Sequence, residues 1–274
     1  MGFKYDKHNK YHRFGRSCLI TAVSLFVLMW VWWLTSMIIQ RSLDLNVSPL
    51  ATPQDSFAAL FELMKNGDPM EHRSLWSWVW SSLSKFIRGF ILALVIALPV
   101  GLLMGNFKIV REFLTPWVEV VRPIAPIAWA PILVIIFQAT NGSIMVVFIG
   151  IFFPLLTNIV FGVQKIDSTL IDAAKTLGAS DGQIFLKVLV PSTVPYLMNG
   201  IKVGLGVGWM CIVAAELYNT SLSGIGYFVK FMIDNSSYDY AFAGIIIIAI
   251  LGLLTTGVAE YISKVVSRRM GVDA

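Results

Sequence analysis

Six long apolar stretches limit what this 274-residue chain can fold into. A hydrocarbon core of about 30 Å is crossed by roughly 20 apolar residues of helix. Lipid offers no partner to backbone polar groups, and the stretches lack the alternation of a barrel strand, so each is expected to form a helix. With 57% hydrophobic and 14% charged residues, the chain is also too apolar for a soluble domain. The predicted spans cover residues 18–39, 80–105, 114–138, 143–163, 195–218 and 240–262.

The loops between these spans differ in their content of lysine and arginine. If both termini are cytoplasmic, most of these residues lie on the cytoplasmic side, and few, among them Arg41, Lys65 and Arg73, lie outside. The positive-inside rule then predicts the N-in, C-in orientation. Topology accounts for the net charge of +5, so the lipid bilayer is an expected partner and nucleic acid is not. The chain divides into a basic tail 1–17, a first span 18–39, an outer loop 40–79, a core 80–265 with five spans, and a tail 266–274.

The outer loop contains a helix signal of its own, TPQDSFAALFELMKNG. Thr52 and Asp55 are spaced for a capping box, Pro53 suits the first helical position, and Gly67 follows Asn66 as a stop signal. A short amphipathic helix on the outer surface is therefore predicted. It either covers the rim of the helix bundle or contacts a partner directly. Its apolar face would consist of Phe57, Leu60, Phe61 and Met64.

Several chemistries lack the residues that they need. The chain has no Gly-Lys dipeptide and hence no P-loop, so ATP is not bound by that route. His8, His12 and His72 lie outside the predicted spans, which argues against haem ligation or a zinc protease in the membrane. Cys18 and Cys211 are isolated within apolar runs and are interpreted as structural. We therefore expect no catalytic residue, no metal site and no cofactor in this chain.

The third predicted span, EVVRPIAPIAWAPILVIIF, is rich in proline. Each proline removes a helical hydrogen bond and clashes with the preceding turn, so this span must be kinked or partly unwound. Non-helical backbone at membrane depth is tolerated where protein or a water-filled cavity covers it. The segment is therefore either a structural kink or part of a translocation path. The path hypothesis comprises Arg122, Pro123, Pro126, Ala128, Trp129, Pro131, Trp209 and Glu216.

The fifth predicted span carries glycine at every fourth position, which allows close packing of another helix. Near its outer end, Glu216 either faces a wet pathway or accepts hydrogen bonds as a structural carboxylate. Glu119 and Arg122, three residues apart in the third span, either pair with each other or contact a substrate. The predicted packing stripe consists of Gly200, Gly204 and Gly208.

The loop 164–194 is polar and helix-prone, and the predicted orientation places it in the cytoplasm. A helix is expected to begin at Asp167 or Ser168, and Gly178 is expected to end it with a positive φ. A second short helix, 181–190, would then run to Pro191. Two helices with a glycine break make a knob that fits a groove on a soluble partner. A re-entrant or surface-lying helix is the alternative.

This loop resembles the EAA loop in the permease subunits of binding-protein-dependent ABC importers. The segments RPIAPIAWAPI, TLGAS, AEL and SGIGY are similar to the nitrate, sulfonate and taurine branch of that family, over about residues 53–265. Aspartate replaces the leading glutamate of the pattern, and valines stand at its two aliphatic positions. The matching positions are Asp172, Ala173, Ala174, Gly178, Val188, Val190 and Pro191, with Leu177 and Ala179 beside the glycine.

The resemblance implies a type I ABC importer permease of the prokaryotic cell membrane, in which the loop couples the chain to an ATPase. It implies as partners two ABC ATPase subunits, a second permease subunit that forms a homodimer, and an extracytoplasmic solute-binding protein. The implied solute is a small anion such as nitrate, a sulfonate, taurine or bicarbonate, although the branch also includes uncharged heterocyclic precursors. An ion channel, or another membrane protein without an ATPase partner, is the alternative from a different class.

Overall fold

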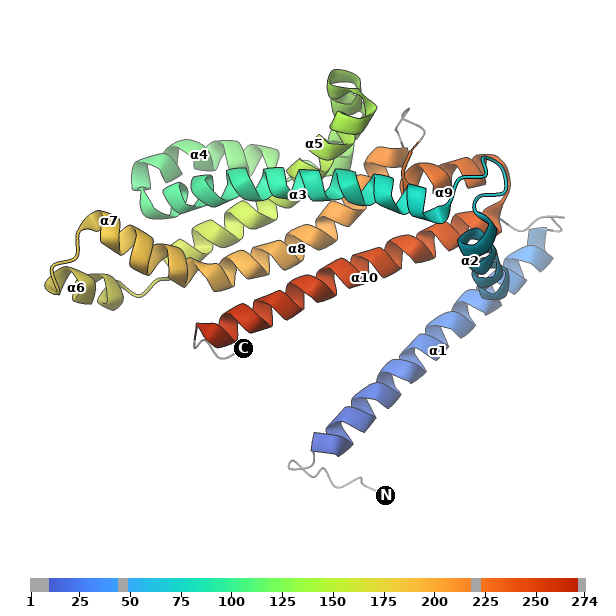
Figure 1. Ribbon diagram of the computed structural model, residues 1–274, viewed down its shortest axis with the longest axis horizontal. Coiled ribbons are helices and arrows are strands. Elements are labelled where there is room, and N and C mark those ends of the chain that lie inside the picture. The colour runs from blue at the N-terminus through green and yellow to red at the C-terminus, as the bar shows by residue number, and fades with distance from the viewer. Residues whose placement is uncertain (1–9, 44–48, 218–222, 271–274) are drawn as a thin grey trace.

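The computed structural model describes residues 10–43, 49–217 and 223–270, and the regular elements in these ranges are helices (Figure 1). In chain order they are α1 Lys10–Leu43, α2 Pro53–Asn66, α3 Leu75–Asn106, α4 Lys108–Val121, α5 Pro126–Gln164, α6 Ser168–Thr176, α7 Asp181–Ile184, the π-helical turn η1 Phe185–Leu189, α8 Val190–Leu217, α9 Ile225–Asp234 and α10 Tyr238–Arg269. The predicted all-α class is therefore confirmed.

Five helical segments of the described chain have the length and hydropathy of a membrane span. They are Leu19–Arg41 in α1, α3, α5, the continuous run Asp181–Leu217, and Tyr238–Arg268 in α10. Four of the six predicted spans each correspond to one of these segments. The remaining two, 114–138 and 143–163, are separated as predicted, because the backbone of α5 is broken at Gln138 and 143–163 lies in the helix that follows the break.

The predicted single helix 114–138 is wrong, and the reason is its prolines. Helix α4 ends at Val121, and the backbone is non-helical until α5 begins at Pro126. A second break follows at Gln138, whose φ of 66° and ψ of 166° interrupt α5. The predicted kinking and unwinding is thus confirmed, and the break at Gln138 separates this stretch from the predicted fourth span, 143–163.

The centre of the bundle is formed by α3, α5 and α8, which pack along much of their length. Gly200, Gly204 and Gly208 lie on the face of α8 that contacts α5. A Cβ atom at Gly208 would come within 2.7 Å of the Ile151 side chain, and one at Gly204 would come within 3.1 Å of it. The stripe thus lets α8 approach α5 more closely than larger residues would allow.

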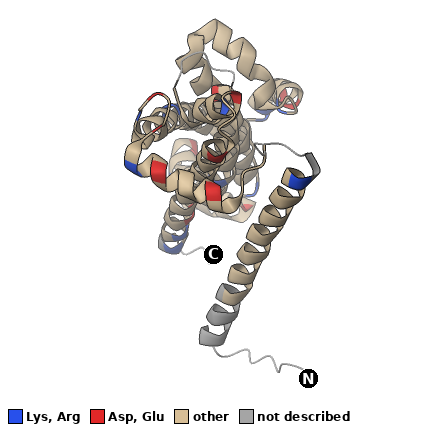
Figure 2. Ribbon diagram, turned by 90° about the vertical axis from the view of Figure 1, so that its right-hand side faces the viewer, with Lys and Arg blue, Asp and Glu red and all other residues tan. Residues whose placement is uncertain are grey.

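Helix α1 lies apart from this centre, as the end view shows (Figure 2). It meets α10 through Trp32, whose ring stacks on Phe242 with centroids 5.6 Å apart. Most of its apolar side chains are exposed, including Phe26 at 71%. An exposed apolar helix of this length is the expected form of a span surrounded by lipid.

Helix α2 forms where it was predicted, at the end of the bundle opposite α6 and α7 (Figure 1). The Thr52 hydroxyl oxygen accepts a hydrogen bond from the Asp55 N–H and donates one to the Asp55 carboxylate, so Thr52 is the N-cap. The predicted apolar face is wrong in large part as a packing surface, because only Leu60 of its four residues packs against the buried cluster. The helix instead buries Ser56, Ala59 and Leu63 against its neighbours and leaves Phe57, Phe61 and Met64 exposed.

Candidate functional site: a protruding helical hairpin and a buried ion pair

Helix α6 begins and ends as the sequence predicts. The Asp167 carboxylate caps it, accepting hydrogen bonds from the Thr169 N–H at 2.9 Å and the Thr169 hydroxyl at 2.6 Å. These two bonds, of which the hydroxyl bond has the larger effect, hold the pKa of Asp167 below its usual value of 3.8. Gly178 follows the helix with a φ of 82°, the left-handed conformation that glycine adopts at least cost.

The second arm of this hairpin differs from its prediction. Ser180 caps α7 in a capping box with Gln183, in which each side chain bonds to the other residue's backbone N–H. The helix runs into the fifth span as predicted, but it is not a separate short helix, because it continues through η1 into α8 without a break. Proline lacks an N–H and displaces the carbonyl one turn earlier, and the wider π turn accommodates that displacement. The hairpin is therefore connected rigidly to the longest helical run that enters the bundle centre.

The hairpin α6–α7 protrudes from one end of the molecule (Figure 1). Helix α6 buries none of its residues, and Leu177 is 88% exposed. The matching positions of the EAA-like pattern fall into two groups. In the second group, where the second arm enters the bundle, Val188 and Val190 are half-buried and Pro191 is exposed. The first group lies on α6 and its C-terminal turn and is exposed or half-buried; it consists of Asp172, Ala173, Ala174, Leu177, Gly178 and Ala179.

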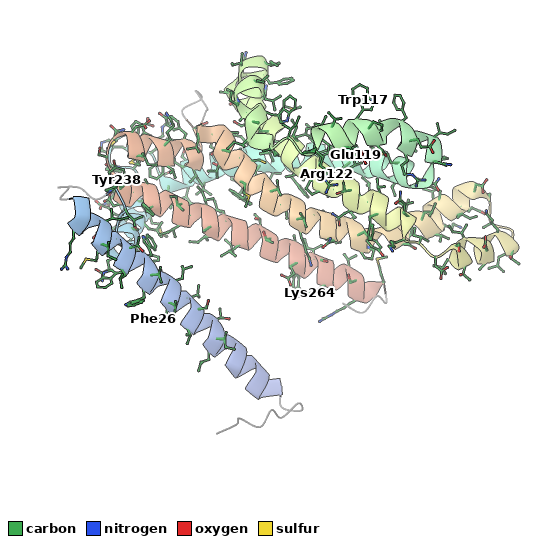
Figure 3. The ribbon with its side chains drawn as sticks, turned by 180° about the vertical axis from the view of Figure 1, so that it is seen from behind. Phe26, Trp117, Glu119, Arg122, Tyr238 and Lys264 are labelled. Carbon is green, nitrogen blue, oxygen red and sulfur yellow. The ribbon has the colours of Figure 1, made fainter. Side chains whose placement is uncertain are left out.

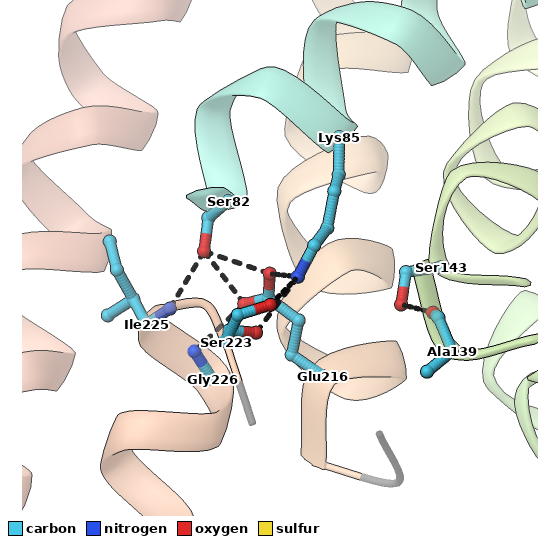
Figure 4. A network of polar contacts seen from close by, with 8 residues as sticks. All are labelled: Ser82, Lys85, Ala139, Ser143, Glu216, Ser223, Ile225 and Gly226. Carbon is cyan, nitrogen blue, oxygen red and sulfur yellow. Dashed lines mark hydrogen bonds and ion pairs between the residues drawn. The ribbon is translucent and has the colours of Figure 1, made fainter. Parts of the chain in front are cut away.

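At the opposite end, Glu216 of α8 lies in a buried polar network (Figure 4). Its carboxylate accepts hydrogen bonds from Lys85 Nζ at 3.0 Å, from the Ser82 hydroxyl at 2.8 Å and from the Gly226 N–H at 3.0 Å. Lys85 also donates to the carbonyl of Ser223 at 2.9 Å and to its hydroxyl at 3.2 Å. The two charged side chains are 0% and 4% exposed, so this is a buried ion pair between α8 and α3.

The glycines that precede and open α9 make room for this carboxylate. Gly224 has a φ of 107°, and a Cβ atom there would overlap the carboxyl group of Glu216. A Cβ atom at Gly226 would lie 2.7 Å from the Val213 carbonyl oxygen and 2.8 Å from Glu216 Cβ. The motifs AEL and SGIGY therefore belong to one structural unit, in which glycine is required because the acid occupies the space.

Sequence reasoning missed Lys85 as the partner of Glu216. The second span was predicted from residue 80, which placed Lys85 near the outer boundary, whereas α3 begins at Leu75 and carries Lys85 into the bundle. One available signal was the pair Ser82 and Lys85, which lie on one face of an otherwise apolar helix. A hydroxyl and an ammonium on one buried face require an acceptor, and Glu216 supplies it.

The proline-rich segment forms the connection between α4 and α5. Arg122 follows α4 as its C-cap and is exposed, and no ion pair joins it to Glu119 in the described chain (Figure 3). On α4 itself, Trp117 points away from the bundle and is 67% exposed. Ala128 is exposed, whereas Trp129 is half-buried with its indole N–H enclosed and unpaired within the described residues.

The other two members of the path hypothesis have partners elsewhere in the bundle. Trp209 stacks on Phe86 of α3 at 4.7 Å and donates its indole N–H to the Thr255 hydroxyl of α10 at 2.8 Å. Glu216 is bound to α3 and to the start of α9, as described above. Both side chains thus have partners on α3, α9 or α10, and a path shared with Pro123, Pro126 and Pro131 stays a prediction.

Comparison with known proteins adds a family and named relatives. The family model described as "Binding-protein-dependent transport system inner membrane component" matches residues 82–270. A putative ABC transporter permease protein of Methanocaldococcus jannaschii is 40% identical over 66% of this chain and 68% of its own length. The taurine transport system permease protein of Escherichia coli is 33% identical over 88% and 86%. The nitrate import permease protein of Leptolyngbya laminosa is 29% identical over 91% and 88%.

A solved structure has the same fold. A chain of the inward-facing MetNI methionine ABC transporter superposes with a TM-score of 0.60, covering 70% of this chain and 97% of that one. The two sequences are 22% identical, so this likeness concerns the arrangement of helices alone.

Proposed function

Because this chain belongs to the family of binding-protein-dependent transport system inner membrane components, we propose that it forms the translocation path of an ATP-driven importer. The chain is a multi-pass inner-membrane permease of the nitrate, sulfonate and taurine branch, a transport subunit and not an enzyme. In the proposal, ATP is hydrolysed by two ATPase subunits that are separate chains. A second copy of this chain completes the path, and a solute-binding protein delivers the solute.

The observation that carries this proposal is the protruding hairpin α6–α7. Its first helix buries nothing, Asp167 and Ser180 cap the N-termini of α6 and α7, and Leu177 projects almost fully exposed. A capped helix with an unpartnered apolar residue at its C-terminal end suits the groove of a soluble protein. We place this hairpin and both termini in the cytoplasm, in the N-in, C-in orientation, where an ATPase subunit would bind it.

The connection from the hairpin to the bundle supports a coupling role. The second arm continues without interruption from Asp181 to Leu217, at the far end of α8, through α7 and η1. A displacement of the hairpin by the ATPase would therefore act directly on the helix that packs against α5. Such a transition requires two bundle arrangements that differ by a few kcal/mol, biased by ATP on one side and by the loaded binding protein on the other.

For the solute we propose a small anion, such as taurine or another sulfonate, nitrate or bicarbonate. The support is the printed names of relatives, which include taurine, nitrate and bicarbonate transport permeases. The path would pass the proline-rich segment Arg122–Pro131, where the exposed Arg122 offers positive charge.

The proposal is tested by purifying the tagged chain from its native membrane in mild detergent. We expect a P-loop ATPase to co-purify with the unaltered chain, and Leu177→Asp to remove it, because a charge would be buried in the groove. Leu177→Met is the matched control and should retain the ATPase. Co-purification unaffected by Leu177→Asp would contradict the docking role of the hairpin, and no associated ATPase at all would contradict the importer.

The solute is tested with the assembled complex in proteoliposomes. Taurine, nitrate and bicarbonate are each supplied with the binding protein, and ATP hydrolysis and uptake are measured. The expected result is stimulation by one of these anions. Stimulation by an uncharged solute instead would contradict the anion assignment and leave the importer function intact.

A further inference from the structure

The apolar surface of α2 is wider than the part that the bundle covers. At about 100° per residue, the buried side chains Ser56, Ala59 and Leu63 occupy one sector of the helix. Phe57, Phe61 and Met64 occupy the adjoining sector and are 38%, 69% and 56% exposed. The remaining sector is polar and contains Gln54, Asp55, Glu62 and Lys65.

These three sectors require three different environments. The first is met by protein, because Leu63 is fully buried in the cluster that includes Trp78 and Phe228. The polar sector is suited to water. The sector between them, with two aromatic rings and a thioether side chain, is not covered by protein and is not suited to water. Three neighbouring exposed apolar residues on one helix face call for a specific contact.

The segment that leads into α2 lies at membrane depth. The Leu50 carbonyl accepts a hydrogen bond from the Ser36 hydroxyl at 2.7 Å, and the Ala51 carbonyl accepts one from the Trp32 indole at 3.1 Å. Ser36 is 0% exposed and both donors belong to the membrane-spanning part of α1, Leu19–Arg41. At about 1.5 Å per residue, they lie about 8 Å and 14 Å below Arg41 along the helix.

No water is available in hydrocarbon surroundings, so loop carbonyls there must accept hydrogen bonds from protein groups such as the side chains of a span. The chain therefore dips below the level of Arg41 before α2 begins at Pro53. Amphipathic helices that lie in a membrane surface are buried by about 5–10 Å into the boundary between headgroups and acyl chains. The depth of the connection and the apolar sector of α2 independently indicate the same boundary.

We infer that α2 is an interfacial helix whose Phe57, Phe61 and Met64 contact lipid acyl chains, in the leaflet at the end of the bundle opposite α6. The lipid surface is the occupant of this sector because the segment that leads into α2 is hydrogen-bonded to the membrane-spanning part of α1. The polar sector has two carboxylates and one ammonium, so it provides no attraction for anionic headgroups. The contact is therefore with acyl chains and does not select a headgroup.

The inference is tested on the full chain in nanodiscs of phosphatidylcholine alone. Cys18 and Cys211 are replaced by alanine, and a spin label is attached to a single cysteine at position 57, 61 or 64, with positions 58 and 65 as controls on the polar side of the same helix. Collision with oxygen reports lipid, and collision with a water-soluble nickel complex reports water. We expect labels at 57, 61 and 64 to lose nickel accessibility and gain oxygen accessibility relative to the controls.

Three results would overturn the inference. Equal nickel accessibility at 61 and 65 would place the sector in water. A label at 61 that neither reagent reaches would place it against protein, a second copy or another chain. Adding phosphatidylglycerol should leave the label at 61 at the same depth, and a depth that changes with lipid charge would contradict the acyl-chain contact. Gel filtration of each labelled protein identifies any variant that has not folded, and the other two positions then carry the test.

Discussion

The hairpin α6–α7 and the Lys85–Glu216 network both introduce polar groups into an apolar chain, at opposite ends of the bundle. In the network, each charged side chain has its bonding capacity met by other residues of the same chain. In the hairpin, hydrogen bonds cap the helix ends, and the helix faces are left to the surroundings. One region is complete by itself, and the other leaves its helix faces exposed, where the proposed ATPase would bind.

The difference follows from where each region lies. Charges removed from water cost several kcal/mol unless they are paired and hydrogen-bonded, so a buried carboxylate is stable only inside a satisfied network. The hairpin meets no such demand, because water solvates its exposed groups. A substitution in the network should therefore reduce the amount of folded protein, whereas one in the hairpin should reduce transport and leave the fold intact.

The largest expected effect is that of Glu216→Gln. The variant leaves the Lys85 ammonium buried without a counter-charge, which should cost about 3–5 kcal/mol of folding free energy. The control is Glu260→Gln, which breaks the exposed pair of Glu260 with Lys264, separated by 2.8 Å, and should cost about 0–1 kcal/mol. Both losses are measured by denaturant titration of the purified protein in detergent.

A double variant sharpens this result. Lys85→Met combined with Glu216→Leu removes both charges, and removing both partners of a buried pair costs less than removing one. We expect it to recover part of the stability lost in Glu216→Gln. Full stability of Glu216→Gln together with impaired transport would instead return Glu216 to the translocation path and end the contrast between the two regions.

The second prediction concerns Gly224, where both the backbone conformation and the contact with Glu216 require glycine. Gly224→Ala places a methyl group against the Glu216 carboxylate at a φ of 107°, and we expect a loss of about 2–3 kcal/mol. Gly257→Ala is the control, because a Cβ atom at that helical position meets nothing within 4 Å. It should be neutral or slightly stabilising. Equal stability of the two variants would show that the network tolerates displacement of its acid.

The sequence predicted these two regions unequally, for a physical reason. Caps and breaks are local signals, so Asp167 as an N-cap and the positive φ of Gly178 were predictable from the neighbouring residues alone. The Lys85–Glu216 pair joins positions 131 residues apart, and no periodicity reports such a contact. The exposed face of α2 was missed for the same reason, since an apolar sector does not indicate whether protein or lipid covers it. The break at Gln138 coincides with the predicted end of the third span at residue 138.

The third prediction compares two glycines within the hairpin. A Cβ atom added at Gly178 or at Gly182 would meet no other atom within 4 Å, but only Gly178 has a positive φ, of 82°. Gly178→Ala should therefore strain the turn by about 1–2 kcal/mol, whereas Gly182→Ala should stabilise α7 slightly. We expect ATP-dependent uptake to fall in the first variant only, with equal amounts of both proteins in the membrane. Unchanged uptake in Gly178→Ala would show that coupling does not depend on the shape of this turn.

The smallest expected effect is the acid sensitivity of α6, which depends on its exposed cap. Hydrogen bonds from Thr169 lower the pKa of Asp167 in the folded helix below its usual value of 3.8. A depressed folded pKa means that the ionised cap stabilises α6 above the unfolded pKa, and that this stabilisation is lost as the pH falls through the folded pKa. Amide exchange in the first turn of α6, corrected for intrinsic rates, should therefore accelerate below about pH 4 and not between pH 5 and 8. Asp167→Asn keeps an acceptor that does not titrate, so its exchange should lack the acid step, and the same step in that variant would assign it to another group. The Lys85–Glu216 network should retain its protection over this range, since the change at Asp167 is confined to the hairpin.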